Sequence, residues 1–230
     1  MRKIKNKKKA ILLSLVLVLA GTSGVLLTLT FGFRPLLKNL LIDFGDWDPA
    51  TNRSGAFLFL QSEDKVFLEF GAEVSGQEGP KILPTFEYRV LANSNVYAPF
   101  DGFIVRLDFQ ADTNDYEIFI APNGFSWVKV SVDHISNLTK SLGQYVMAGE
   151  IIGKPGTWYG ELGRVELSIN ENPNIHRAPF ALFDLELRAE YEALVTEHMK
   201  DWEDFKGNTS IYDQENMVYP GCNCGSLVGI

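Results

Sequence analysis

Two glycine-containing phrases constrain the fold of this chain more than any other feature. They are VYAPFDGFIV at residues 96–105 and VMAGEIIG at residues 146–153. Each places a turn-forming glycine beside short runs of β-branched and aromatic residues, which is typical of strands that enter and leave a tight bend. Between them, residues 116–120 and 127–132 alternate apolar and polar side chains, as strands with one buried face do. The sequence therefore predicts a β-sheet core in this region.

The same alternation predicts which side chains fill the core of the sheet. We expect the buried face to be formed by these residues: Phe103, Val105, Ile118, Ile120, Val128, Val130 and Val132. Ahead of the sheet, residues 56–60 and 65–70 are expected to pair as a hairpin across a turn at residues 62–64. After the sheet, the Asn and Pro residues of segment 170–179 predict an irregular linker.

A helix is expected after that linker. Asp184 has the chemistry of an N-cap and Glu186 follows in the first turn, where a negative charge is favourable. Gly207 is expected to end the helix. Apolar and aromatic side chains between them recur at steps of three and four residues, so we predict one C-terminal amphipathic helix packed on the sheet. They are Leu187, Tyr191, Leu194, Val195, His198, Trp202 and Phe205.

The N-terminus predicts membrane attachment. Residues 1–9 hold six of the 21 basic groups, and the 24 residues at positions 10–33 carry no charge and are mainly apolar. Such a span can cross a hydrocarbon layer of about 30 Å as a helix, with its basic end in the cytoplasm. A cleaved signal peptide ending near residues 18–20 is the alternative. Either way, we expect a single-pass or exported protein whose C-terminal domain lies outside the cytoplasm.

The charge of the exported part limits which classes of partner it can bind, and its cysteine content limits the cross-links it can form. Residues 34–230 carry 15 basic groups against 29 acidic ones, a formal charge of about −14, which should repel nucleic acid and anionic lipid. Two cysteines cannot form a disulfide framework. Cys222 and Cys224 could form a strained disulfide or a two-thiolate metal clip.

The predicted segments are a basic segment at 1–9, the anchor at 10–33, a juxtamembrane region with the hairpin at 34–79, the β core at 80–170, and the linker, helix and tail at 171–230.

The order of several short phrases suggests a family. VYAPFDG is followed by two strands, VDHISNL, GQYVMAGEIIGKPG and GRVELSI. This order resembles the core of the lysostaphin-type (LytM-like) zinc endopeptidases, which cut peptidoglycan cross-bridges, and it covers roughly residues 80–170. The resemblance implies a mainly β fold with an antiparallel sheet of the duplicated hybrid motif kind.

The resemblance also points to candidate site residues. In the family, zinc is held by a His, an Asp four residues later, and the second His of a His-x-His pair. These positions match Leu83 and Glu87, and then Arg164 and Glu166 for the pair. Leu83 has no lone pair, and Arg164 would place a fixed positive charge beside a dication. Glu87 and Glu166 remain as metal-ligand positions, and His134 matches a family His that assists the transition state without ligating zinc.

Each candidate residue also has a simpler interpretation. Glu87 and Glu166 could be solvent-facing strand residues paired with Arg89 or Arg164, and His134 a hydrogen-bonded residue at a strand end. No spacing supports His176 as a replacement ligand. Biotinyl and lipoyl carrier domains share similar turn phrases, but they present a modifiable lysine, and the loops at residues 112–115 and 123–124 contain none.

We therefore predict a membrane-anchored domain that has lost its zinc site, holds no cofactor, and acts as a non-catalytic binding or scaffold module of the cell envelope. Its expected partner is an envelope glycan or another envelope protein. The alternative is a divergent zinc endopeptidase that uses His134, Glu87, Glu166 and one further ligand.

Overall fold

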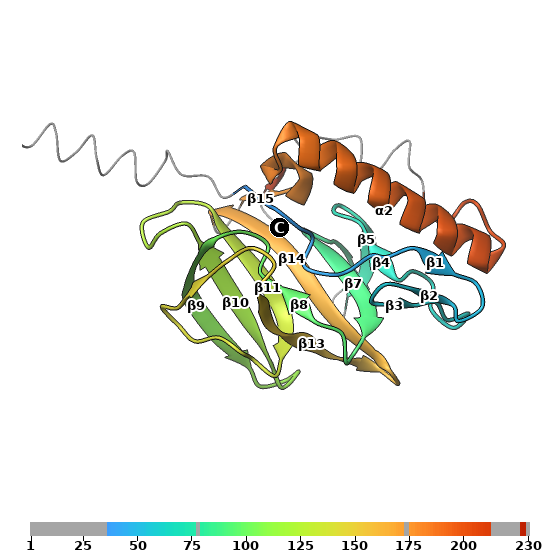
Figure 1. The fold of residues 1–230 in the computed structure, drawn as a ribbon, viewed down its shortest axis with the longest axis horizontal. Helices are drawn as coiled ribbons and strands as arrows, with labels where there is room; N and C mark the ends of the chain where they lie inside the picture. The colour runs from blue at the N-terminus through green and yellow to red at the C-terminus, as the bar shows by residue number, and fades with distance from the viewer. Residues whose placement is uncertain (1–35, 77–78, 173–174, 213–225, 229–230) are drawn as a thin grey trace, which may run out of the picture.

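A computed structural model describes residues 36–76, 79–172, 175–212 and 226–228 of the 230-residue chain. Within these ranges the fold is mainly β, with one antiparallel sheet of 11 strands as its body. A single long helix, α2 (Leu185–Lys206), lies above this sheet (Figure 1). The predicted combination of an antiparallel sheet and one C-terminal helix is confirmed.

Strand β14 (Leu162–Asn172) crosses the middle of the sheet (Figure 1). It pairs antiparallel with β7 (Thr85–Leu91) on one side and with β11 (Lys129–Ser136) on the other. Beyond β11 follow β10 (Asp115–Ala121) and β9 (Gly102–Gln110). Strand β13 (Ile151–Tyr159) pairs with the start of β14 and with the end of β11. Of these strands, β7, β11 and β13 pair directly with β14.

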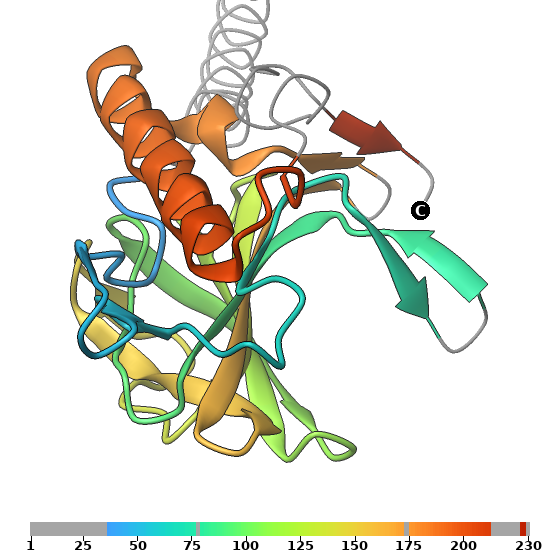
Figure 2. The same cartoon turned by 90° about the vertical axis from the view of Figure 1, so that its right-hand side faces the viewer.

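Short strands complete the structure. Strands β1 (Trp47–Asp48), β2 (Arg53–Ser54) and β3 (Phe57–Leu58) form a separate three-stranded sheet. A hairpin of β5 (Glu73–Gly76) and β6 (Gly79–Ile82) projects from the body in Figure 2. The main sheet also contains five short strands: β4 (Phe67–Leu68), β8 (Val96–Tyr97), β12 (Tyr145–Val146), β15 (Ile175–Arg177) and β16 (Ser226–Val228).

Most of the predicted sheet core is confirmed, but two positions on β9 are wrong. Ile118, Ile120 and the valines at positions 128, 130 and 132 are buried, whereas Phe103 is 40% exposed and Val105 is only half-buried. A register shift causes the error: Arg106 pairs with Phe119, but Ile104 pairs with Ile120, so Val105 is an extra residue. Such a bulge changes which alternate residues face the core. Ile104 is therefore the buried residue here.

Two expectations for the flanking segments are also wrong. The predicted hairpin does not form, because β3 pairs with β2 while β4 pairs with β7. The predicted linker contains β15, which pairs with the end of β14 and extends the sheet. The leucines at 37, 40 and 41 of the juxtamembrane region form no helix and are buried in the core. Backbone pairing with distant strands overrides these local signals.

Helix α2 agrees with its prediction in position and capping. The Asp184 side chain accepts a hydrogen bond of 3.0 Å from the Leu187 backbone N–H, and Gly207 ends the helix in the left-handed region at φ 65°. The helix reaches the sheet through aromatic side chains. His198 packs on Phe57 with ring centroids 4.2 Å apart, and Phe57 in turn meets Tyr88 of β7. An aromatic layer from the N-terminal segment therefore lies between helix and sheet.

The predicted anchor at residues 10–33 and both cysteines lie outside the described residues. Among the residues that are described, no helix combines the length and the apolar character needed to cross a membrane.

Candidate functional site

Three residues singled out in the sequence meet at the centre of the main sheet. On β14, Glu166 has Glu87 of β7 as its cross-strand partner on one side and Asp133 of β11 on the other. His134 follows Asp133, and its Nε2 lies 3.5 Å from Glu166 Oε1. The structure thus brings His134, Glu87 and Glu166 to one face. Leu83 is buried just ahead of β7, and His176 lies on β15, opposite Asn170 and away from this centre.

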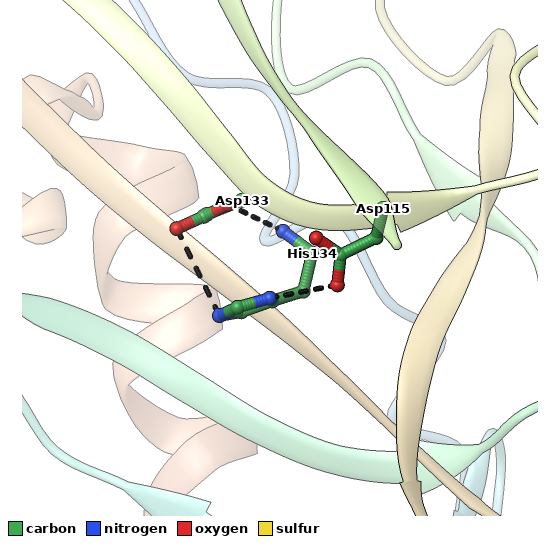
Figure 3. A group of neighbouring side chains, drawn as sticks. All are labelled: Asp115, Asp133 and His134. Atoms are coloured by element: carbon green, nitrogen blue, oxygen red, sulfur yellow. Dashed lines mark hydrogen bonds and ion pairs between the residues drawn. The ribbon is translucent and has the colours of Figure 1, made fainter. Parts of the chain in front are cut away.

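The ring of His134 is held between charged groups at both of its nitrogens (Figure 3). Its Nδ1 lies 2.9 Å from Asp115 Oδ2. Its Nε2 lies 3.8 Å from Asp133 Oδ2 and 2.5 Å from Nη2 of Arg164. A guanidinium can only donate, so Nε2 accepts from Arg164 and the Nδ1 proton is donated to Asp115. The imidazole is fixed in one orientation by these two bonds.

Local backbone geometry explains how His134 comes to point into this cluster. Strand β11 pairs with β14 up to Asp133 and with β13 from Ile135 onward, so His134 lies where the strand changes partner. Its φ is 58°, which is uncommon for a residue with a side chain and is often found at functional sites. A Cβ at Gly156 of β13 would lie 2.5 Å from Asp115 Oδ2 and 3.2 Å from the His134 carbonyl oxygen. Glycine is therefore needed there for the Asp115 and His134 contact.

Two arginines and an aromatic ring complete the cluster. Arg89 Nη1 lies 2.6 Å from Glu87 Oε1, and its guanidinium lies 3.5 Å from the ring centre of Trp158. The Arg164 guanidinium lies 5.3 Å from the same ring, within the range of a cation–π interaction. Thr85 donates a 3.0 Å hydrogen bond to Glu166 Oε2. Glu87 is only 4% exposed, so the interpretation of it as solvent-facing is wrong, while its pairing with Arg89 is confirmed.

Burial and neighbouring charges set the ionisation of these carboxyl groups. Burial raises the pKa of Glu87, and the facing Glu166 carboxylate raises it further. Burial also raises the pKa of Asp133. Burial acts on Glu166 in the same direction, but its contacts with His134 and the charge of Arg164 outweigh this and hold its pKa below the ordinary value. Glu166 is therefore the carboxylate that stays ionised most readily, beside the Arg164 guanidinium.

The carboxylates around His134 are candidate metal ligands. Ligand atoms of Asp115, Asp133 and His134 lie within 4.8 Å of one another. However, Asp115 meets Nδ1 while Asp133 faces Nε2, on the opposite edge of the ring (Figure 3), so one ion cannot bind the ring together with both carboxylates. At Nε2, where Asp133 and Glu166 converge, the Arg164 guanidinium is already bound. The residues present therefore do not fit the zinc ion that the family resemblance implies.

Sequence analysis missed part of this cluster. Asp133 stands beside His134 in the phrase VDHISNL and could have been noticed there. Asp115 and Gly156 gave no signal, because the contact of Asp115 with His134 joins residues 19 positions apart on neighbouring strands. Arg89 was considered only as a partner for Glu87, and its stacking on Trp158 depends on the packing of β13 against β7.

This chain resembles known proteins in its structure, and no match is found from its sequence. Neither a protein-family model nor a curated protein matches the sequence. The solution structure of lysostaphin matches with a TM-score of 0.42 and 20% identity, over 53% of this chain and 49% of that one. This chain therefore spans about half the length of that lysostaphin.

Two further structures show the same likeness. The catalytic domain of lysostaphin from Staphylococcus simulans matches with a TM-score of 0.40 and 20% identity, over 49% of this chain and 86% of that domain. A zinc-containing peptidase from Vibrio cholerae matches with a TM-score of 0.39 and 13% identity, over 61% and 39% of the two chains. The likeness is one of fold, and the chemistry of the site rests on its own residues.

Proposed function

We propose that this protein is a membrane-anchored, exported module of the cell envelope that binds its partner without hydrolysing it. The observation that carries the proposal is the 2.5 Å contact between Arg164 Nη2 and His134 Nε2. A zinc hydrolase needs a metal with an open position at which water is activated. Here a guanidinium occupies the ring nitrogen that faces the carboxylates, so the cluster serves to hold strands together.

The remaining carboxylates support the same conclusion. Glu87 is paired with Arg89, and Glu166 receives a hydrogen bond from Thr85. In a buried cluster, such mutual pairing offsets the cost of removing charges from water. Side chains that are already bound to one another in this way are not available to carry out a step of hydrolysis.

The surface beside the cluster favours a glycan as the partner. Tyr159 is 68% exposed and Trp158 is 41% exposed, at the turn between β13 and β14. Trp158 also contacts the guanidinium of Arg89. Exposed aromatic rings present flat apolar faces with polar edges, which suits the rings of a sugar polymer. Recognition of another envelope protein is the other outcome that the experiment below distinguishes.

Attachment to the membrane is part of this proposal. It rests on the six basic groups in residues 1–9 and on the uncharged span at residues 10–33. The formal charge of about −14 on the remainder argues against nucleic acid and anionic lipid as partners of the exported part.

Sedimentation with purified peptidoglycan tests the proposal. The detergent-solubilised full chain should sediment with peptidoglycan and release no cross-bridge peptide. Tyr159→Ala should weaken retention, whereas Phe125→Ala, which removes another exposed aromatic ring, should not. Equal retention of both variants together with capture of one envelope protein would favour a protein partner. Chelator-sensitive cleavage of the cross-bridge would instead establish the alternative of a divergent zinc endopeptidase and overturn the proposal.

A further inference from the structure

We infer that one end of the folded domain lies on the headgroup layer of the membrane that holds the anchor, and that the loop at residues 122–128, between β10 and β11, inserts there. The inference rests on the membrane attachment proposed above and adds a fixed orientation of the domain. It does not depend on which partner the module binds.

The short connection between anchor and domain carries the first step. The uncharged span ends at Phe33, and the first described residue is Leu36, three residue steps later. Each step adds at most about 3.6 Å, so Leu36 lies within about 11 Å of the end of the span. The headgroup layer on each side of the hydrocarbon core is itself roughly 5–8 Å thick. The part of the domain around Leu36 is therefore held at the membrane surface.

Contacts of the next two residues fix which end of the domain this is. The backbone N–H of Leu37 donates to the carbonyl oxygen of Leu182, just ahead of α2. The backbone N–H of Lys38 donates to the carbonyl oxygen of Pro99, just ahead of β9. The Lys38 ammonium also lies 3.6 Å from the carboxylate of Asp184, the N-cap of α2. The chain therefore enters the domain beside the starts of α2 and β9.

Antiparallel pairing brings the loop at residues 122–128 to this same end. Strands β9 and β11 begin, and β10 and β14 finish, at one end of the sheet (Figure 1). Ala121, the last residue of β10, pairs with Phe103 near the start of β9. Phe103 in turn packs on Tyr145 with ring centroids 5.0 Å apart. The loop that follows Ala121 thus lies at the end of the sheet where the chain enters.

Exposed apolar and aromatic side chains gather at this end. In the loop, Phe125 is 63% exposed and Trp127 is 51% exposed. Aromatic side chains are enriched where a protein crosses the headgroup layer, because their rings are apolar with a polar edge. The exposed apolar residues at this end are Leu36, Phe103, Phe125, Trp127, Tyr145 and Leu185.

The charge and internal bonding of the loop also suit a membrane surface. Residues 34–230 carry a formal charge of about −14, yet the segment APNGFSWVK at residues 121–129 contains no acidic group and ends in a lysine. Asn123 Oδ1 accepts a 2.9 Å hydrogen bond from the Phe125 backbone N–H, and Ser126 Oγ donates to the Val128 carbonyl oxygen at 2.9 Å. These bonds hold the loop in shape while its aromatic rings remain exposed.

The orientation has a consequence for the partner surface. Trp158 and Tyr159 lie at the turn before β14, at the opposite end of that strand. Strand β14 has 11 residues and, at about 3.3 Å per residue, spans about 35 Å. A domain that stands on the membrane by its loop end therefore presents these two rings away from the bilayer.

Quenching of tryptophan fluorescence by brominated lipid tests the inference. All four tryptophans, at positions 47, 127, 158 and 202, lie in the folded domain, so the anchor adds no signal. The full chain is reconstituted in uncharged phosphatidylcholine vesicles with or without bromine on the acyl chains. Bromine should weaken wild-type emission, and Trp127→Phe should lose most of this effect. Trp158→Phe is the matched control at the opposite end and should keep it.

A second pair of variants keeps the reporter ring in place. Phe125→Ala should weaken the quenching, because the loop loses one of its two exposed rings. Phe109→Ala removes a ring that is 55% exposed near the end of β9, away from the membrane-facing end, and should leave the quenching unchanged. Far-UV circular dichroism checks that each variant is folded.

The outcomes separate the orientation from the attachment. If wild type floats with the vesicles but shows no bromine-dependent loss, or if Trp127→Phe retains the loss, the orientation is overturned and the attachment stands. Failure of the full chain to float with vesicles would overturn the attachment and this inference with it. Emission that changes with the number of chains per vesicle, and not with bromine, would assign this end to contact between copies and also overturn the inference.

Discussion

At the scale of single residues, the cluster depends on one backbone feature and one glycine. His134 adopts φ 58° where β11 changes partner, and Gly156 leaves the space in which Asp115 reaches the ring. The cost of this local strain is offset by the charged hydrogen bonds at both ring nitrogens. The placement of these two residues therefore decides whether the ionic cluster can form.

Gly156→Ala should destabilise the protein by about 1–3 kcal/mol, because the new Cβ would lie 2.5 Å from the Asp115 carboxylate. Urea unfolding followed by circular dichroism measures this change. Gly124→Ala is the matched control, since nothing lies within 4 Å of a Cβ at that position. Equal unfolding midpoints for the two variants would show that the Asp115 and His134 contact has room for a methyl group.

His198 should make stability fall in acid. Burial lowers its pKa to about 3, and its Nδ1 lies 3.2 Å from Ser54 Oγ among aromatic rings. The unfolded histidine binds a proton below about pH 6.5, so the unfolded state binds more protons down to about pH 3, and stability falls as pH falls through that window. Between pH 7 and pH 5 the loss attributable to His198 is about 2 kcal/mol.

Comparison of unfolding free energies at pH 7 and pH 5 tests this prediction. The His198→Leu variant should lack that part of the acid sensitivity, because it has no ring to protonate. His176→Gln, which removes a half-buried histidine on β15, should keep it. A His198→Leu variant with the full acid sensitivity of wild type would contradict the assignment to His198.

At the scale of elements, α2 is joined to the sheet by aromatic contacts and not by strand pairing. Trp202 is fully buried and its Nε1 donates a 3.2 Å hydrogen bond to the Asp64 carbonyl oxygen. Its ring also meets Phe59 edge-on, with centroids 5.1 Å apart. The helix thus covers the layer of aromatic side chains that comes from the N-terminal segment and packs on β7.

Trp202→Ala should therefore cost about 3–5 kcal/mol in unfolding free energy, through the cavity it leaves and the loss of apolar burial. Leu185→Ala on the same helix is the control and should cost far less, since Leu185 is 85% exposed. Denaturant unfolding of both variants measures the difference. A wild-type midpoint for Trp202→Ala would show that the helix does not dock as described.

At the scale of the whole molecule, the sheet joins segments that are distant in the chain. The central strand β14 lies between β7 and β11, and the Leu37 backbone N–H donates to the Leu182 carbonyl oxygen. The first described residues thus pack on the same core as the segment just ahead of α2. This arrangement places the first described residues on the folded domain, directly after the proposed anchor.

Membrane attachment gives a prediction at this scale. The full chain should fractionate with membranes, resist extraction by high salt and dissolve in detergent, because about 20 apolar residues suffice to span the bilayer. A chain that lacks residues 1–35 should appear in the soluble fraction. Cell fractionation with immunoblotting measures both. A mature N-terminus near Gly21 in the soluble fraction would instead indicate a cleaved signal peptide.

The sequence alone determined the features that depend on neighbouring residues. The two glycine phrases, the alternation around Ile118 and Val130, and the caps of α2 at Asp184 and Gly207 are local patterns, and the structure agrees with them. Tertiary structure decided the rest. Two features depend on which strands meet. They are the pairing of β4 with β7 and the bulge at Val105, which changes which alternate residues of β9 face the core. The contact between Arg164 and His134 joins residues 30 positions apart, so only the folded sheet could show that a guanidinium takes the centre of the cluster.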